Sequence, residues 1–245
     1  MKLDLILPLY KPSGNWAELI ADAVKNLRSR LSSYGELHLY ITNDGAAENF
    51  YPPHLLSQIN DAADGNLHFL PYANNRGKGY SLRHLLNFAD GDFQVYTDGD
   101  FPFGWESVAE AFIMLINGAD VVMGRRDHSY SSALSPFRKC LSGGLKMLNW
   151  VLCGLPSEIQ DTQAGLKGFN RRGKELFLRT SVDTFVFDTE FILLAWHCKL
   201  QIVPLDIKLR QGLTLSSMGL KVMFRELFCF ARVLWKIRIR KDFGK

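Results

Sequence analysis

The hydrophobic pattern of the first half of the chain alternates between short apolar runs and longer amphipathic segments. Five runs have the length and composition of buried strands: residues 3–10, 36–44, 67–73, 93–98 and 119–126. Three intervening segments repeat apolar residues at helical spacing: residues 15–31, 80–89 and 105–117. Strands separated by such helices predict right-handed crossovers and a mostly parallel sheet, and hence an α/β fold.

The second half is less regular. A Ser-rich loop at 127–137 precedes a predicted helix at about 138–152, and a helix at 189–200 leads into a strand at 201–210. We find no internal repeat and no low-complexity segment.

The last segment predicts a long amphipathic helix that ends in the basic sequence KIRIRKDFGK. One apolar stripe contains Leu220, Met223, Phe224, Leu227, Phe228, Ala231, Leu234 and Trp235. Two interpretations stay open. The stripe packs on the domain, or the helix docks on an anionic membrane surface or on a partner protein.

Length and charge limit the possible classes. A chain of 245 residues with 47% hydrophobic content can form one α/β domain. We place this α/β domain at 1–215 and the amphipathic helix at 216–245. The net charge of +4 suits a phosphorylated ligand or an anionic surface. No run of Lys and Arg interleaved with aromatics indicates a nucleic-acid partner.

The cysteines and the hydropathy bear on the compartment. Cys140, Cys153, Cys198 and Cys229 are scattered without a Cys-x-x-Cys pair, so we expect reduced thiols. We also expect no secretion signal and no membrane-spanning helix, because no apolar run is long enough. The expected location is cytoplasmic, at the inner face of a membrane if the last helix docks there.

Two carboxylates one residue apart end the run at 93–98, in the sequence TDGD. Asp98 and Asp100 together suit a divalent cation that also binds phosphate oxygens, because Mg²⁺ prefers one or two carboxylates plus substrate phosphates. Mn²⁺ would serve as well. An isolated Asp-Gly-Asp is more often only a turn. A phosphohydrolase is disfavoured, because such enzymes carry the pair on an early strand with a Thr where this chain has Pro102.

The motifs around this pair occur in a recognisable order. LPLYKP, TNDGA, NNRGKG, TDGD, GRR, QDTQAGLKGF and FDTEFILLA follow one another along the chain. In this order and approximate spacing, residues 1–215 resemble family 2 glycosyltransferases, and more narrowly the polyprenyl-phosphate glycosyltransferases of the dolichyl-phosphate mannosyltransferase or glucosyltransferase type. QDTQAGLKGF is the most specific of these motifs.

The resemblance implies a GT-A fold and transfer of a sugar, with inversion, from a nucleotide-diphosphate sugar such as GDP-mannose or UDP-glucose to a polyprenyl phosphate. It implies metal binding at Asp98 and Asp100, with Mg²⁺ or Mn²⁺ as cofactor. Asp161 would lie close to the reacting centre, with Asp100 as the direct ligand of the metal. The residues implied for nucleotide-sugar binding are Pro8, Tyr10, Asp44, Lys78, Asp98 and Gln160. The residues implied for the acceptor phosphate are Arg126, Arg138 and Arg210.

Several of these residues also have ordinary structural explanations. Tyr10 could be a core aromatic, Asp44 could form a turn with Gly45, and Arg126 could be a solvated surface charge. The sequence GKG at 77–79 lacks phosphate-loop spacing and favours a tight turn and a helix start. Asp188 and Glu190 could shape the acceptor site, but the dipole of the helix that they begin is enough to explain them.

The chain departs from the family pattern near the nucleotide and the metal. Lys11 and Pro12 replace the usual Asn and Glu after the Tyr, and Asn43 replaces an acid. Phe101-Pro102-Phe103 stands where relatives often place a Gln that assists the metal.

Three alternatives remain. A glycosyltransferase acting on a sugar hydroxyl would need a general base, for which Asp161 is the candidate. An inactive nucleotide-sugar binding module is the second, and a nucleotidyltransferase is the third.

Overall fold

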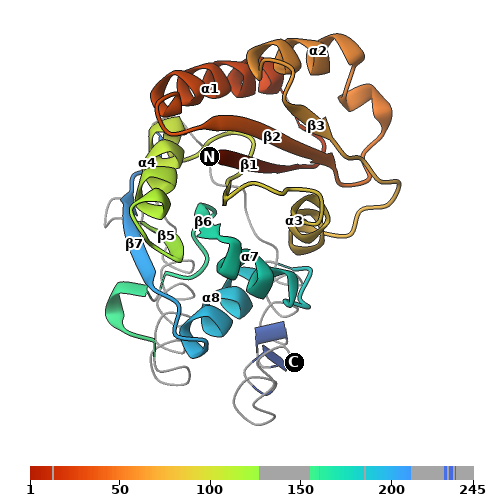
Figure 1. Ribbon diagram of the computed structural model, residues 1–245. Coiled ribbons are helices and arrows are strands. Elements are labelled where there is room, and N and C mark those ends of the chain that lie inside the picture. The colour runs from red at the N-terminus through yellow and green to blue at the C-terminus, as the bar shows by residue number, and fades with distance from the viewer. Residues whose placement is uncertain are drawn as a thin grey trace.

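The fold is built on a seven-stranded sheet. The structure is a computed structural model that describes residues 1–12, 14–126, 155–159, 161–184 and 186–210, with Cys229, Phe230, Arg232, Val233 and Trp235 (Figure 1). The strand order is β3-β2-β1-β4-β6-β5-β7. The strands are β1 Lys2–Leu9, β2 Glu36–Asn43, β3 Leu67–Phe69, β4 Phe93–Tyr96, β5 Val121–Arg126, β6 Lys167–Asn170 and β7 Ile202–Ile207.

One strand of this sheet is reversed. β6 pairs antiparallel with both β4 and β5, whereas the other pairings are parallel. The carboxyl ends of six strands and the amino end of β6 therefore meet at one edge. Ligands of α/β sheets bind at such an edge.

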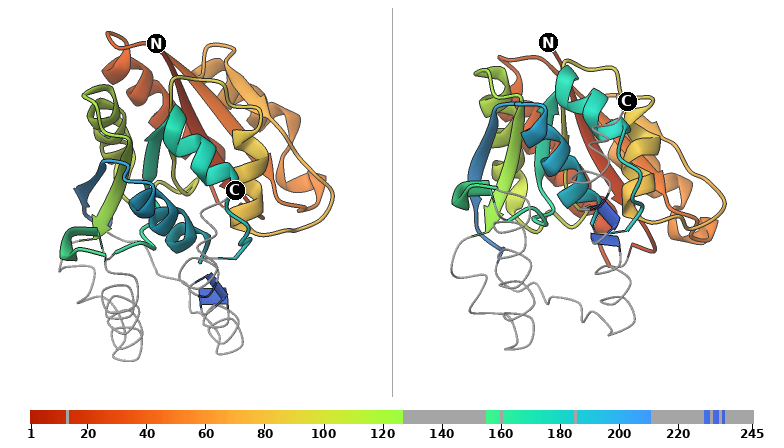
Figure 2. Two further views of the ribbon diagram at one scale, coloured as in Figure 1. Left: turned by 60° about the horizontal axis from the view of Figure 1, so that its bottom comes forward. Right: turned by 90° about the horizontal axis from the view of Figure 1, so that it is seen from below.

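Helices cover both faces of the sheet (Figures 1 and 2). One face carries α1 Trp16–Leu31, α2 Pro53–Ala62 and α4 Gly104–Ile116. The other carries α3 Lys78–Leu86, α7 Arg171–Leu178 and α8 Phe187–His197. Two short 3₁₀ helices, η1 Glu48–Phe50 and η2 Ser157–Ile159, lie in connections.

Each face has its own hydrophobic core, as the alternation along β1 requires. Leu3, Leu5 and Leu7 join the core under α1, and Ile6 joins the core under α3. The second core is rich in aromatic rings, whose centroids lie 5.1 to 6.3 Å apart among Tyr96, Phe169, Phe177, Phe187 and Phe191. Rings at this spacing favour edge-on and offset contacts.

Most elements predicted from the pattern are confirmed, with shifted ends. The predicted strand at 67–73 is only Leu67–Phe69, because Pro71 follows and Tyr72 makes an isolated bridge to Asp44. The sequence pattern did not predict α2, β6 or α7. β6 is only four residues long and begins with Lys167 and Gly168, which are poor strand formers.

The predicted C-terminal helix can be judged at five residues. Phe230 and Val233 are buried in the second core, which is consistent with a helix packed on the domain. Trp235, which the pattern places on the apolar stripe, is 47% exposed. The predicted loop at 127–137 and helix at 138–152 lie outside the described residues. Among the described residues, no helix is long and apolar enough to span a membrane, and Cys198 and Cys229 are free thiols.

A carboxylate is buried at the opposite edge of the sheet, in β1. Asp4 has no solvent exposure; its Oδ2 accepts from the Gly91 amide at 2.6 Å and from Gln94 Nε2 at 3.3 Å. Asp4 Oδ1 and Gln94 Oε1 have no hydrogen-bond partner. Burial raises the pKa of Asp4, and the nearby Asp90 adds to the rise while the two hydrogen bonds and Lys2 oppose it.

This raised pKa predicts how stability depends on pH. A carboxyl whose pKa is higher in the folded state than in the unfolded state destabilises the fold when ionised, and the penalty disappears below the unfolded value. Asp4→Asn should therefore stabilise the protein at pH 8 by about 1 kcal/mol, because the neutral amide carries no buried charge and its oxygen can still accept from the Gly91 amide. The advantage should shrink as the pH falls to about 4.

Thermal unfolding of Asp4→Asn across this pH range measures the effect. The exposed Asp22→Asn on α1 is the matched control and should change little. A lower melting temperature for Asp4→Asn than for the wild type at pH 8 would contradict the prediction.

Candidate active site

The residues implied for chemistry converge on the edge where the strands end. They come from five separate segments: Asp44 after β2, Asp98 and Asp100 after β4, Arg126 at the end of β5, Asp161 before β6 and Arg210 after β7. The reversal of β6 brings Asp161 to this edge. Gln160 and Arg138 lie outside the described residues.

Asp98 is held from two sides. Its Oδ1 accepts from Lys78 Nζ at 2.5 Å, and its Oδ2 lies so close to Gly165 that a β-carbon there would be 2.7 Å away. Burial alone would lower the pKa of Lys78, but Asp98 and Asp188 raise it, so its ammonium stays charged. The following Gly99 packs against Leu9, where a β-carbon would lie 2.2 Å from the leucine side chain.

Asp100 lies in the turn that follows. Desolvation and the neighbouring Asp98 raise its pKa, while Lys78 and Arg210 act in the opposite direction. The backbone amide of Arg210 donates to the Pro102 carbonyl at 2.8 Å, which ties the end of β7 to this turn. Arg210 thus lies near the carboxylate pair, at the edge where the strands end.

The donor set fits a divalent cation bound together with phosphates. The charge of Asp98 opposes ionisation of Asp100, and a cation bound between the two carboxylates would offset that repulsion. Among the residues with described positions, no group of three or more His, Cys, Asp or Glu side chains could form an all-protein metal cage. Asp98 and Asp100 with water and substrate oxygens are the arrangement that Mg²⁺ and Mn²⁺ accept.

Asp44 closes the loop at 72–77 onto the end of β2. Its Oδ1 accepts from the Tyr72 hydroxyl at 2.8 Å and from the Arg76 amide at 2.7 Å. Its Oδ2 accepts from Asn75 Nδ2 at 3.1 Å and from the Gly77 amide at 3.0 Å. These four bonds use the acceptor capacity of the carboxylate. Asp44 therefore shapes the site by holding the loop that leads to Lys78.

Pro8 and Tyr10 stand at the end of β1. Pro8 is half-buried and pairs in register with Thr42, while Tyr10 is 49% exposed with Lys11 Nζ 5.1 Å from its ring centroid. The exposure of Tyr10 excludes the core-aromatic explanation. Its ring is available to a ligand at this edge.

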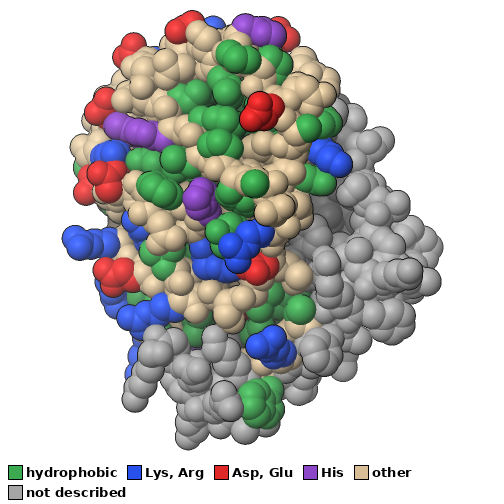
Figure 3. Space-filling view, turned by 90° about the vertical axis from the view of Figure 1, so that its right-hand side faces the viewer, with side chains coloured by type: hydrophobic (Ala, Val, Ile, Leu, Met, Phe, Trp, Pro, Cys, Tyr) green, Lys and Arg blue, Asp and Glu red, His purple; other side chains and the backbone are tan. Residues whose placement is uncertain are grey.

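A hollow of about 630 Å³ opens beside Asp44, at the ends of β2 and β3. Aromatic and small side chains line it, with polar groups at Asn43 and Glu48: the lining includes Ala46, Ala47, Tyr51, Phe69, Tyr72 and Ala73. Its position next to the loop at 72–77 gives the site room for an aromatic or apolar group of a ligand. Figure 3 shows the side of the molecule on which hydrophobic side chains lie interspersed with charged ones.

Arg126 and Asp161 form an ion pair. The Asp161 carboxylate, 4% exposed, accepts from the Arg126 backbone amide and Nε, both at 2.9 Å, and from Nη2. Two parallel side-chain bonds plus a backbone bond fix the plane of the guanidinium. The pair explains why Arg126 is not the solvated charge that its sequence context also allowed.

The glycines of GKG pack against a distant loop. A β-carbon at Gly77 would lie 2.8 Å from the Asp183 carbonyl, and one at Gly79 would lie 2.5 Å from the Val182 carbonyl. Gly77 also has a φ of +94°, which other residues rarely adopt. The expected tight turn and helix start are confirmed, and they place Lys78 at the site.

Sequence reasoning missed the functions of the acids at the start of α8. Glu190, 1% exposed, accepts from the amides of Ser181 and Val182 at 2.8 and 2.9 Å, so it holds the loop on which Gly77 and Gly79 pack. Asp188 accepts from Lys167 and from Tyr96. The helix dipole alone is therefore an insufficient explanation. A usable signal was that both acids lie in a run, FDTEFILLA, that is otherwise almost entirely apolar.

Lys167 was also missed. It is completely buried at the start of β6, and burial lowers its pKa while Asp188 opposes the change. Its place between apolar residues and glycines in AGLKGF was the available sequence signal.

Solved structures with the same fold include two sugar transferases. Mannosyl-3-phosphoglycerate synthase from Rubrobacter xylanophilus is 15% identical, with a TM-score of 0.66, over 98% of this chain and 74% of that one. Glucosyl-3-phosphoglycerate synthase from Mycobacterium tuberculosis, in complex with Mn²⁺, UDP-glucose and phosphoglyceric acid, is 15% identical, with a TM-score of 0.63, over 96% and 79%. These similarities confirm the GT-A fold.

Curated relatives are more similar in sequence. The dolichyl-phosphate beta-glucosyltransferase of Saccharomyces cerevisiae is 25% identical over 84% of this chain and 66% of its own length. The Dictyostelium discoideum protein of the same name is 25% identical over 96% and 77%. The chain thus spans about two thirds to three quarters of the length of these relatives. The resemblance to polyprenyl-phosphate sugar transferases is confirmed.

The sequence profile described as "Glycosyl transferase family 2" matches residues 4–171. This range contains β1 to β6, the carboxylate pair and Asp161, which are the parts of the edge described above. The chain is therefore a glycosyltransferase and belongs to family 2.

Proposed function

We propose that this glycosyltransferase moves glucose from UDP-glucose to a polyprenyl phosphate, with inversion and with Mg²⁺ or Mn²⁺ at Asp98 and Asp100. The curated relatives named above, dolichyl-phosphate beta-glucosyltransferases, support the sugar and the class of acceptor. The β linkage in those names is the product that inversion of an α-linked nucleotide sugar gives. The Mn²⁺ and UDP-glucose in the M. tuberculosis complex support the donor and the metal.

One observation carries the acceptor assignment: the implied carboxylates at this edge already have hydrogen-bond or ion-pair partners or belong to the proposed cation site. Asp98 is bonded to Lys78, Asp161 to Arg126, and Asp188 to Lys167 and Tyr96. Asp44 accepts four bonds from its loop. Asp100 belongs to the cation site. None of these carboxylates, which are the ones that the resemblance implies for the reaction, is free to act as a general base, and an alcohol acceptor requires one.

A phosphate acceptor removes that requirement, because its oxygen is already ionised at neutral pH. The acceptor oxygen forms a bond to C1 of the sugar from the face opposite the diphosphate. The bond from C1 to the diphosphate oxygen breaks, and its electron pair leaves with the nucleoside diphosphate. No proton has to move in this step.

The groups around the leaving diphosphate match the charge that grows there. When bound, the cation would stabilise the negative charge on the diphosphate oxygens. Asp98 and Asp100 would hold that cation, and Lys78 adds a positive charge beside Asp98. Asp98 is held before substrate arrives by Lys78 and by its packing on Gly165, and the Arg210 amide ties the turn that carries Asp100 through the Pro102 carbonyl.

We assign acceptor-phosphate binding to Arg126 and Arg210, and the resemblance adds Arg138, which is outside the described residues. Asp161 orients the guanidinium of Arg126, so we give Asp161 a positioning function instead of proton transfer. Arg210 follows β7 at the same edge. A lipid acceptor places the reaction at a membrane surface, and we propose its cytoplasmic face.

The proposal predicts a lipid-dependent, metal-dependent reaction. Purified protein with a short polyprenyl phosphate, a panel of UDP- and GDP-sugars and Mn²⁺ should release UDP from UDP-glucose only when the lipid is present. EDTA should abolish release, and Asp100→Ala should lower it at least about 100-fold, because the cation loses a ligand. The exposed Asp22→Asn is the control. Release of UDP that depends on a sugar acceptor without a phosphate would contradict the proposed acceptor. Nucleotide binding without any transfer would indicate an inactive binding module.

Asp161→Asn separates positioning from base catalysis. If Asp161 only orients Arg126, the KM for the lipid phosphate should rise about 10-fold or more, while kcat at saturating lipid should fall less than about 10-fold. Loss of a general base would instead lower kcat by about 10² to 10⁴, so the rate would fall by this factor even at saturating acceptor. Steady-state kinetics with varied lipid phosphate measures the difference, and that second pattern would contradict the proposal.

A further inference from the structure

We infer that Lys167, Asp188 and Tyr96 form a buried cluster that positions Asp98 for binding of the metal and the donor diphosphate. The inference rests on the proposed function and deepens it, because it assigns control of the metal site to residues that do not touch the substrate.

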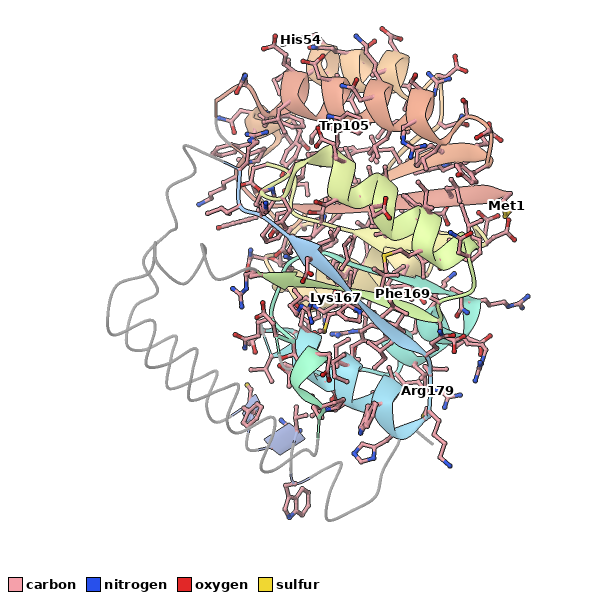
Figure 4. All side chains as sticks on the ribbon, turned by 90° about the vertical axis from the view of Figure 1, so that its left-hand side faces the viewer. Met1, His54, Trp105, Lys167, Phe169 and Arg179 are labelled. Atoms are coloured by element: carbon pink, nitrogen blue, oxygen red, sulfur yellow. The ribbon has the colours of Figure 1, made fainter. Side chains whose placement is uncertain are left out.

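The cluster is compact and closed to solvent. Lys167 Nζ lies 2.9 Å from Asp188 Oδ1 and donates to the Ala164 carbonyl at 2.6 Å. The Tyr96 hydroxyl donates to the same Asp188 oxygen, and Lys167 Nζ lies 5.9 Å from the centroid of the Tyr96 ring. The side chain of Lys167 is fully buried and that of Asp188 is 6% exposed. Figure 4 shows Lys167 in the interior, beside Phe169 and between the sheet and α8.

Two connections lead from this cluster to Asp98. Tyr96 is the last residue of β4, two residues before Asp98 in the chain. Ala164, which Lys167 holds through its carbonyl, immediately precedes Gly165, and Gly165 lies against Asp98 Oδ2. The strand that carries Asp98 and the turn that packs on it are therefore both tied to Asp188 on α8.

The charges of the cluster also connect it to Lys78, the residue that holds Asp98. Lys78 is attracted by Asp188 and repelled by Lys167. Asp188 thus offsets the charges of two neighbouring cations, Lys78 and Lys167. Without it, repulsion between Lys167 and Lys78 would act on the residue that holds Asp98.

Stability alone does not account for a buried ion pair of this kind. Replacing such a pair with well-packed neutral groups is often neutral or stabilising, because the charges recover little more than their desolvation cost. The aromatic core around Tyr96 and Phe169 could accept an apolar pair at this position. The position of the pair beneath the metal site favours a function in geometry.

The test removes both charges while keeping size and the acceptor of Tyr96. Lys167→Met combined with Asp188→Asn leaves an oxygen for the tyrosine hydroxyl and no unpaired charge. The matched control is Lys2→Met combined with Asp90→Asn, which neutralises a Lys–Asp pair at the opposite edge of the sheet. Thermal unfolding reports the fold, and calorimetric titration with UDP and Mn²⁺ reports the site without any acceptor.

We expect the Lys167/Asp188 variant to melt within a few degrees of the wild type and to bind UDP with Mn²⁺ at least 10-fold more weakly. Its KM for the lipid phosphate should stay within 3-fold, because the acceptor arginines lie on other strands. The control variant should bind like the wild type. Unchanged UDP binding in a folded Lys167/Asp188 variant would overturn the inference and leave the proposed function standing.

A second variant covers failure of the first to fold. Tyr96→Phe removes one hydroxyl and no charge, and it should weaken binding of UDP with Mn²⁺ at least 3-fold with little loss of melting temperature. Unchanged binding in Tyr96→Phe would again overturn the inference. Failure of the wild type to bind any nucleoside diphosphate with Mn²⁺ would overturn the proposed function, and the inference with it.

Discussion

The arrangement of residues at the edge where the strands end depends on the reversed direction of β6. A parallel strand between β4 and β5 would bring its carboxyl end to this edge, and Asp161 would lie at the other side of the sheet. Because β6 runs antiparallel to both neighbours, the turn before it arrives beside Asp98. The same reversal starts the strand with Lys167 directly below the turn, where it meets Asp188 of α8. One strand direction thus places both the wall of the proposed metal site and the cluster beneath it.

The loops at this edge are held by carboxylates more than by hydrophobic packing. Asp44 closes the loop before α3, Glu190 holds the loop before α8, and Asp161 fixes the end of β5 through Arg126. Each acid accepts from backbone amides that no strand or helix satisfies, which is what buried loop backbone requires. Acidic side chains used in this way are unavailable as bases. The architecture of the loops therefore bears directly on which acceptor the enzyme can use.

The sequence predicted those features that depend on local pattern. The alternation of apolar runs identified the parallel strands, and the paired acids after the run at 93–98 pointed to the place where the fold gathers the residues of the proposed site. Contacts between distant segments were out of reach, because the partner of Lys167 depends on the direction of a four-residue strand with weak strand propensity. The four donors of Asp44 depend on the path of the loop at 72–77. The apolar stripe of the last helix does not tell which side of the helix meets the core: Trp235 on the stripe is 47% exposed, whereas Phe230 and Val233 are buried.

Because the Asp44 carboxylate already accepts four hydrogen bonds, holding the loop and contacting the ligand belong to different residues at the proposed nucleotide end of the site. The carboxylate keeps the loop and Lys78 in place, whereas the neighbouring hollow is lined in part by Ala46, Ala47 and Ala73. Small residues of this kind can be exchanged for larger ones without breaking a bond to Asp44. The recognition of different ligand groups can therefore diverge among related chains while the scaffold of the diphosphate site stays the same.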